Sequence, residues 1–157
     1  MGNTKHHKCH EKNKSPKRFA AILNGSNEVP PNSSIATGKF IGLLYNNNRL
    51  EFALQTLNLR NIIAAHFHDG PPGVNGPVVK SINIDPVTGD AVGSWTANDS
   101  EPLTPELVRK LKAGLIYINV HTTTLPGGEI RGQVFKIKTP KINCRCVPKC
   151  EKKTKYY

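Results

Sequence analysis

Three histidines in the middle of the chain have the spacing of a metal site. His66 and His68 form an H-x-H pair, and His121 ends the later segment INVHT. Alternate residues of a strand project to the same face, so three imidazoles on two strands can approach one ion. Imidazole nitrogens are good ligands for copper and zinc. The sequence therefore predicts a candidate Cu or Zn site.

The same histidines also fit a purely structural interpretation. In it, the imidazoles hydrogen-bond Asp69, Glu129 or loop backbone and hold the 66–77 loop to the body of the protein. Asp69, Glu129 and Arg131 are then an ion-pair cluster near these loops. No Ser/His/Asp or Cys/His arrangement indicates catalysis. Both interpretations of the histidines stay open, and a non-enzymatic protein is predicted.

The segments that must position these residues have the pattern of β-structure. Apolar and β-branched residues come in short runs separated by turn residues, as strands of a sandwich or barrel require. Asn46, Asn47 and Asn48 predict a hairpin loop, because Asn tolerates the left-handed conformation of such turns. Eight strands are predicted, at residues 19–23, 36–45, 49–57, 62–67, 78–84, 92–97, 115–121 and 130–138.

One short helix is predicted after residue 104. Thr104 is suited to the N-cap, Pro105 to the first helical position, and Glu106 to the positive end of the helix dipole. Gly114 is suited to ending the helix. The apolar side of this helix consists of Leu107, Val108 and Leu111.

The charge of the chain is unevenly distributed. The 157 residues carry a formal net charge of +11, of which residues 1–18 and 140–157 each contribute +5 and residues 19–139 only +1. We therefore expect one near-neutral β domain, 19–139, between two basic arms. The first arm is expected to be disordered. The arms also hold all four cysteines, which are Cys9, Cys144, Cys146 and Cys150.

Cysteines placed outside the domain favour disulfides to neighbouring chains over a framework that stabilises the fold. A zinc knuckle of Cys144, Cys146 and Cys150 with Cys9 or His10 is an alternative, although its spacing is not that of a usual finger. The basic arms also predict attraction to an anionic polymer, but no aromatic residues interleave with them as base stacking in a nucleic-acid site requires. No signal peptide and no membrane-spanning run is visible.

Four motifs in order, within residues 19–138, resemble the CHRD domain, which is named after the secreted protein chordin. They are FAAILNGSNEVPP, AAHFHDGPPGVNGPVV, LKAGLIYINVHT and PGGEIRGQV. The resemblance implies an immunoglobulin-like or superoxide-dismutase-like β-sandwich or barrel of about eight strands with one short helix. It also implies distant similarity to copper-zinc superoxide dismutases, in which an H-x-H pair, a later V-H and an arginine form the copper site. Those positions are His66, His68, His121 and Arg131, with Arg131 attracting the anion.

The chain departs from the dismutase pattern. No histidine lies between His68 and His121, so the bridging ligand and the zinc-site histidines are missing, and the domain has no cysteine pair. The favoured interpretation is a non-enzymatic structural or interaction module of a cell or spore surface. Its arms would cross-link or anchor it to other chains of the same layer. The alternative is a Cu- or Zn-binding protein with a three-histidine site.

Overall fold

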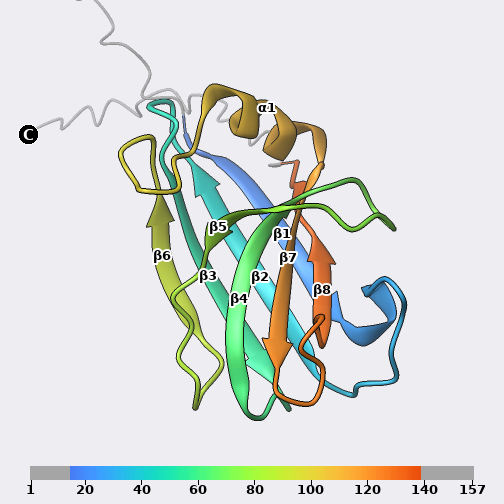
Figure 1. Cartoon of the computed structure of the whole chain (residues 1–157). Helices are drawn as coiled ribbons and strands as arrows, with labels where there is room; N and C mark the ends of the chain where they lie inside the picture. Colours follow the sequence, from blue (N-terminus) through green and yellow to red (C-terminus); the bar gives the residue numbers. More distant parts are fainter. Residues whose placement is uncertain (1–14, 139–157) are drawn as a thin grey trace, which may run out of the picture.

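Nine strands form one antiparallel sheet that curls into a nearly closed barrel. The structure is a computed structural model and describes residues 15–138. Its strand order is β5-β4-β7-β8-β1-β2-β3-β6, and β9 also pairs with β1 (Figure 1). The strands are β1 Lys17–Asn24, β2 Thr37–Leu44, β3 Leu50–Leu57, β4 Ile62–Asp69, β5 Val78–Ser81, β6 Ala91–Trp95, β7 Ile116–Thr122, β8 Ile130–Gln133 and β9 Phe135–Lys136.

The core lies inside the barrel and follows from strand alternation. Along β2, for example, every second side chain is buried, and the same alternation is visible in β3. Aromatic rings from different strands meet in the centre, where Phe67 stacks on Trp95 with 5.1 Å between ring centroids and meets the edge of Phe52 at 5.2 Å. Burial of such rings supplies much of the stability of a small all-β domain.

The barrel closes between β5 and β6 through side chains. These two strands are the ends of the strand order. Lys80 on β5 forms an ion pair with Asp99 (3.0 Å), which lies in the segment after β6. The backbone N–H of Ser81 donates to Glu101 Oε2 at 2.8 Å, and its hydroxyl donates to Oε1 at 3.0 Å. The unpaired edge of β5 is therefore partly covered.

One α-helix, α1 Pro105–Ala113, lies across one end of the barrel (Figure 1). Thr104 caps it by accepting a hydrogen bond from the Leu107 N–H, and Gly114 ends it in the left-handed conformation at φ 74°. A 3-10 turn, η1 Gly25–Asn27, follows β1. Within residues 15–138, no helix is long and apolar enough to cross a membrane.

The all-β barrel with one short helix confirms the predicted fold class, and the predicted helix caps are also confirmed. Asn48 adopts the left-handed conformation (φ 58°) expected in the loop between β2 and β3. Several strand boundaries differ, and the predicted strands 78–84 and 92–97 end earlier, at Ser81 and Trp95. The predicted strand 130–138 is interrupted at Val134, whose N–H donates to Ile116 on β7, so it is two strands, β8 and β9. β1 begins two residues early, at Lys17, and β4 continues to Asp69.

Two loops flank the side of the barrel formed by β4, β7 and β8. One is the β1–β2 loop, residues 25–36, and the other is the β4–β5 loop, residues 70–77 (Figure 1). They contact each other, because Asn75 Nδ2 donates to the carbonyl oxygen of Val29 at 2.8 Å. Polar side chains that project from the outer face of these strands therefore lie partly under the two loops.

Candidate metal centre

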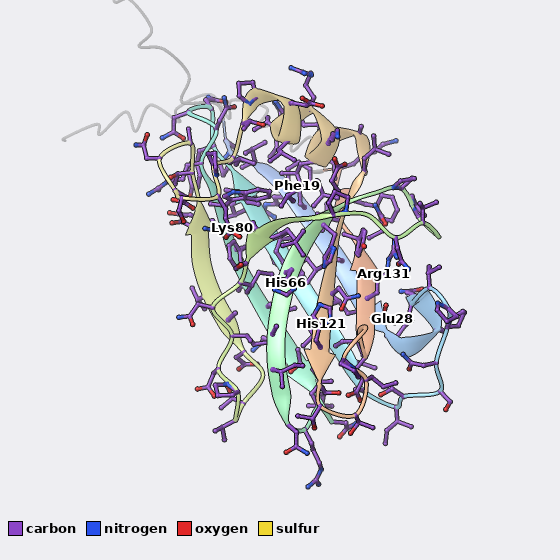
Figure 2. The ribbon with its side chains drawn as sticks, in the orientation of Figure 1. Phe19, Glu28, His66, Lys80, His121 and Arg131 are labelled. Atoms are coloured by element: carbon purple, nitrogen blue, oxygen red, sulfur yellow. The ribbon has the colours of Figure 1, made fainter. Side chains whose placement is uncertain are left out.

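The three predicted histidines lie together on the outer face of β4 and β7. His66 and His68 are both on β4, because that strand extends past its predicted end. β7 is antiparallel to β4, and its register pairs Ala64 with His121 and His66 with Asn119. His121 is therefore a diagonal neighbour of His66. Figure 2 shows His66 and His121 side by side on these strands.

The imidazole nitrogens of this cluster are close enough to share one ion. One nitrogen from each ring lies within 4.8 Å of the other two. His66 Nδ1 and His121 Nε2 are 3.1 Å apart. With metal–nitrogen bonds of about 2.1 Å, a tetrahedral ion separates its ligand nitrogens by about 3.4 Å. The His66–His121 distance is close to that separation, and distances of up to 4.8 Å within the cluster would have to shorten on binding.

Backbone carbonyl groups determine which nitrogens of the cluster have free lone pairs. His68 Nδ1 lies 3.0 Å from the Gly76 oxygen, and His121 Nδ1 lies 2.9 Å from the Pro126 oxygen. A carbonyl oxygen only accepts, so both Nδ1 atoms carry the proton and both Nε2 atoms of the neutral rings carry a lone pair. His68 is 8% exposed, and its Nε2 has no hydrogen-bond partner among residues 15–138.

The surroundings of the cluster favour neutral imidazoles. Burial lowers the pKa of His66 below its usual value, and the neighbouring His121 lowers it further. Burial is also the main cause of the lowered pKa of His68, although its bond to Gly76 opposes the change. A metal binds the neutral form of histidine, so the lowered pKa values of His66 and His68 favour the form that can coordinate near neutral pH.

Arg131 is 2% exposed and contacts the Tyr117 ring, which in turn contacts His68. Its guanidinium carbon is 3.5 Å from the centre of the Tyr117 ring, and Tyr117 in turn stacks on His68 with 4.7 Å between ring centroids. The guanidinium donates to Asn75 Oδ1 and to the carbonyl oxygens of Pro71 and Val74. Its donors therefore face the β4–β5 loop.

The predicted ion-pair cluster of Asp69, Glu129 and Arg131 is wrong for the residues that the structure describes, because both carboxylates have other partners. Asp69, at the end of β4, forms an ion pair with Lys110 of α1. Glu129 accepts hydrogen bonds from Ser34 Oγ and Thr122 Oγ1, both at 2.6 Å, and so joins the β1–β2 loop to β7. The hydrogen bonds found for Asp69 and Glu129 within residues 15–138 thus connect structural elements.

Two further polar residues belong to this face and were not predicted. Glu28 in the β1–β2 loop is 5% exposed and accepts a hydrogen bond from Asn119 Nδ2 at 3.1 Å. Burial raises the pKa of Glu28 to about 7, although the positive charge of Arg131 opposes the shift. The alternation Tyr117-x-Asn119-x-His121 was a visible signal for Asn119, whereas Glu28 is a single acid among loop residues.

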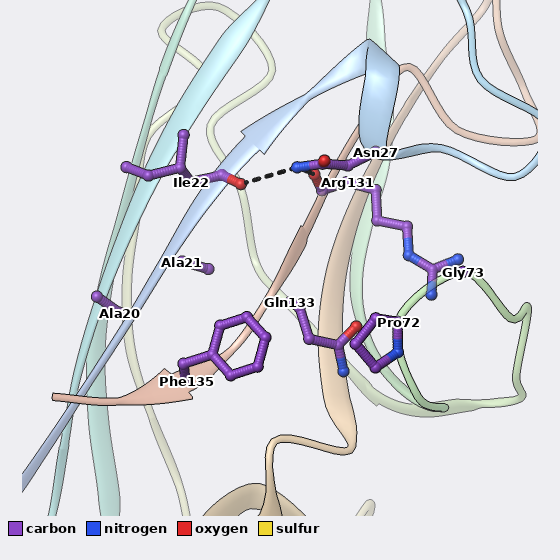
Figure 3. A pocket seen from close by; sticks show the side chains of 9 residues that line it. All are labelled: Ala20, Ala21, Ile22, Asn27, Pro72, Gly73, Arg131, Gln133 and Phe135. Carbon is purple, nitrogen blue, oxygen red and sulfur yellow. Dashed lines mark hydrogen bonds between the residues drawn. The ribbon is translucent and has the colours of Figure 1, made fainter.

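A hollow of about 430 Å³ is lined in part by Arg131 (Figure 3). Its apolar walls include Ile22, Pro72 and Phe135, and Arg131 and Gln133 also line it. It is distinct from the histidine cluster, since none of the three histidines lines it. The predicted cross-linking residues, Cys9, Cys144, Cys146 and Cys150, lie outside the described residues.

One known domain family matches most of the chain. The family model of the CHRD domain matches residues 19–134, which include most of β1, all three histidines and β8. No curated protein and no solved structure matches the chain. The similarity to copper-zinc superoxide dismutases that the sequence suggested is therefore not borne out by these comparisons.

Proposed function

This chain belongs to the CHRD domain family, and we propose that it is an extracellular interaction module whose barrel binds one copper or zinc ion. The CHRD domain is a module of extracellular proteins and is not an enzyme family, so membership indicates interaction. The ligands of the ion would be His66 Nδ1, His68 Nε2 and His121 Nε2.

The observation that carries the metal proposal is the unpartnered Nε2 of His68. A buried nitrogen lone pair without a partner costs free energy, so its retention needs a reason. One nitrogen of His68 lies within 4.8 Å of a nitrogen of His66 and of one of His121, and Nε2 is the His68 nitrogen that carries the lone pair, because Nδ1 is bonded to Gly76. Hydrogen bonds from the second ring nitrogen to backbone carbonyls are also the usual way in which proteins orient metal-binding histidines.

The chemistry of the ligands favours copper or zinc. Three neutral imidazoles are borderline ligands that suit both ions, whereas magnesium and calcium prefer oxygen. In the protein without metal, His66 Nδ1 donates its proton to His121 Nε2, because that Nε2 carries the lone pair. Binding requires His66 to carry its proton on Nε2 instead. Three protein ligands leave a fourth position on the ion, which an interaction partner can occupy.

Calorimetric titration of the full chain with Cu(II) and Zn(II), after treatment with a chelator, tests this proposal. The arms also hold residues that can bind metals, so a background variant replaces all of them with Ala or Ser: His6, His7, Cys9, His10, Cys144, Cys146 and Cys150. We expect that variant to bind one ion. Adding His68→Ala should abolish this binding with the fold unchanged by circular dichroism. Absence of binding to the background variant at micromolar metal would refute the proposal.

A second candidate function concerns the arms. All four cysteines lie outside the 19–134 match and none lies in the barrel. Lys and Arg around Cys144, Cys146 and Cys150 favour the thiolate, which is the reactive form. We propose that these thiols join the module to other chains of a cell or spore surface layer.

A further inference from the structure

We infer that Arg131 is a positioning residue for the metal centre: it fastens the β4–β5 loop so that the Gly76 carbonyl keeps the His68 Nε2 lone pair directed at the ion. This inference rests on the proposed metal-binding function. It gives Arg131 a role through its hydrogen bonds to the loop, which differs from attraction of an anion by its charge.

The contacts of Arg131 support this role. Burying a guanidinium is costly unless its donors are satisfied, and Arg131 is 2% exposed. Three of its hydrogen bonds go to residues 71–75, at 3.3 Å to Pro71 O, 2.8 Å to Val74 O and 3.0 Å to Asn75 Oδ1. One rigid planar group thus holds three successive parts of the loop, which a lysine could not do.

The loop then places Gly76 beside His68. The Gly76 N–H donates to Tyr117 Oη at 3.1 Å, and its carbonyl oxygen accepts from His68 Nδ1 at 3.0 Å. A Cβ at position 76 would collide with the carbonyl oxygen of Asp69, so only glycine permits this close approach. The position of the accepting oxygen therefore depends on how the preceding residues are held.

Loss of the carbonyl would remove the reason for His68 to keep its proton on Nδ1. Without an acceptor there, the proton can move to Nε2, and the lone pair then lies on the nitrogen that faces away from the ion. A ring with its proton on Nε2 must return to the Nδ1–H form before it binds a metal, and this change costs part of the free energy of binding. Loss of an outer-shell partner of this kind typically weakens metal affinity by about 10- to 100-fold.

The first measurement needs no metal. Two-bond ¹H–¹⁵N correlation spectra of the full metal-free chain report which nitrogen of each histidine carries the proton. We expect His68 to carry it on Nδ1 in the unmodified chain and to gain the Nε2–H form in Arg131→Gln. Arg131→Lys keeps the charge but loses the planar group, so we expect the same change. Arg49→Gln, at an exposed arginine paired with Glu51, is the matched control.

The second measurement is Cu(II) affinity by calorimetry in the background variant without the arm ligands. We expect a loss of about 10- to 100-fold in Arg131→Gln and Arg131→Lys, and none in Arg49→Gln. Tyr117→Phe removes the hydroxyl that holds the Gly76 N–H but keeps the ring against His68. It provides a milder variant, with a smaller shift of the same kind, should the Arg131 variants fail to fold.

The outcomes separate the positioning role of Arg131 from the proposed metal binding. A folded Arg131 or Tyr117 variant in which His68 keeps the Nδ1–H form would overturn the positioning role. Full recovery of affinity by Arg131→Lys would overturn it as well, because charge alone would then suffice. Absence of metal binding by the background variant would refute the proposed function, while the tautomer spectra would still decide whether Arg131 acts on His68.

Discussion

Glu28 and Asn119 form a buried pair in which one proton determines whether two oxygens have partners. Asn119 Nδ2 donates to Glu28 Oε2 at 3.1 Å, whereas Glu28 Oε1 and Asn119 Oδ1 are buried with no partner among residues 15–138. A proton on Oε1 that is donated to Oδ1 would satisfy both atoms and complete a pair of hydrogen bonds between acid and amide. The charged group that most affects Glu28 is Arg131 of β8, and the neighbouring carboxylate Glu129 is bonded to Ser34 and Thr122.

This pair predicts a pH dependence of stability. Burial raises the pKa of Glu28 from 4.5 to about 7, so between these values the folded state binds more protons than the unfolded state. The contribution of Glu28 to the free energy of unfolding is therefore fully present below pH 4.5 and is lost as the pH rises toward about 7. The total loss is about 3 kcal/mol. Glu28→Gln keeps both hydrogen bonds without a charge. We expect it to be more stable than the unmodified protein at pH 8, with the difference shrinking toward pH 5, by urea denaturation.

The matched control for Glu28 is Glu106→Gln, at a carboxylate on the exposed side of α1 that is 63% exposed at its side chain. This control should shift the unfolding midpoint little at either pH. If Glu28→Gln were as destabilising at pH 8 as at pH 5, the ionised carboxylate would be the native form and the acid–amide pair would be wrong.

At the scale of elements, α1 depends on one side-chain cap. Thr104 Oγ1 accepts from the Leu107 N–H at 3.2 Å, which satisfies a donor that the first turn of a helix leaves free. We expect Thr104→Ala to lower the free energy of unfolding by about 1 kcal/mol, measured in urea. Thr124→Ala, at an exposed loop position, is the control and should have little effect. Equal effects of the two substitutions would contradict a capping role.

Elements governed by neighbouring residues could be predicted from the sequence, and elements governed by distant contacts could not. The cap at Thr104 and the alternation that groups His66 with His68 are local signals. The break at Val134 depends on a hydrogen bond to Ile116 on another strand. The roles of Glu28 and Arg131 depend on loops crossing a sheet face, which requires the strand order, and no local pattern encodes that order.

At the scale of the whole molecule, charge and thiols are separated from the barrel. Residues 19–139 carry a net charge of +1 and no cysteine, while the two arms each carry +5 and together hold all four cysteines. Two kinds of association are consistent with this distribution. Disulfides between arms would be covalent, whereas attraction of the arms to an anionic polymer would weaken steeply with salt.

Gel electrophoresis and size-exclusion chromatography of the full chain separate these kinds of association. After mild oxidation we expect covalent oligomers on non-reducing gels, dispersed by reductant but stable to high salt and to a chelator. Replacing Cys9, Cys144, Cys146 and Cys150 with Ser should give monomers with an unchanged unfolding midpoint, because the barrel contains no cysteine. A monomeric oxidised chain would refute cross-linking. Oligomers that persist in the serine variant but disperse in salt would assign the association to the charge of the arms, and dispersal by the chelator would assign it to metal.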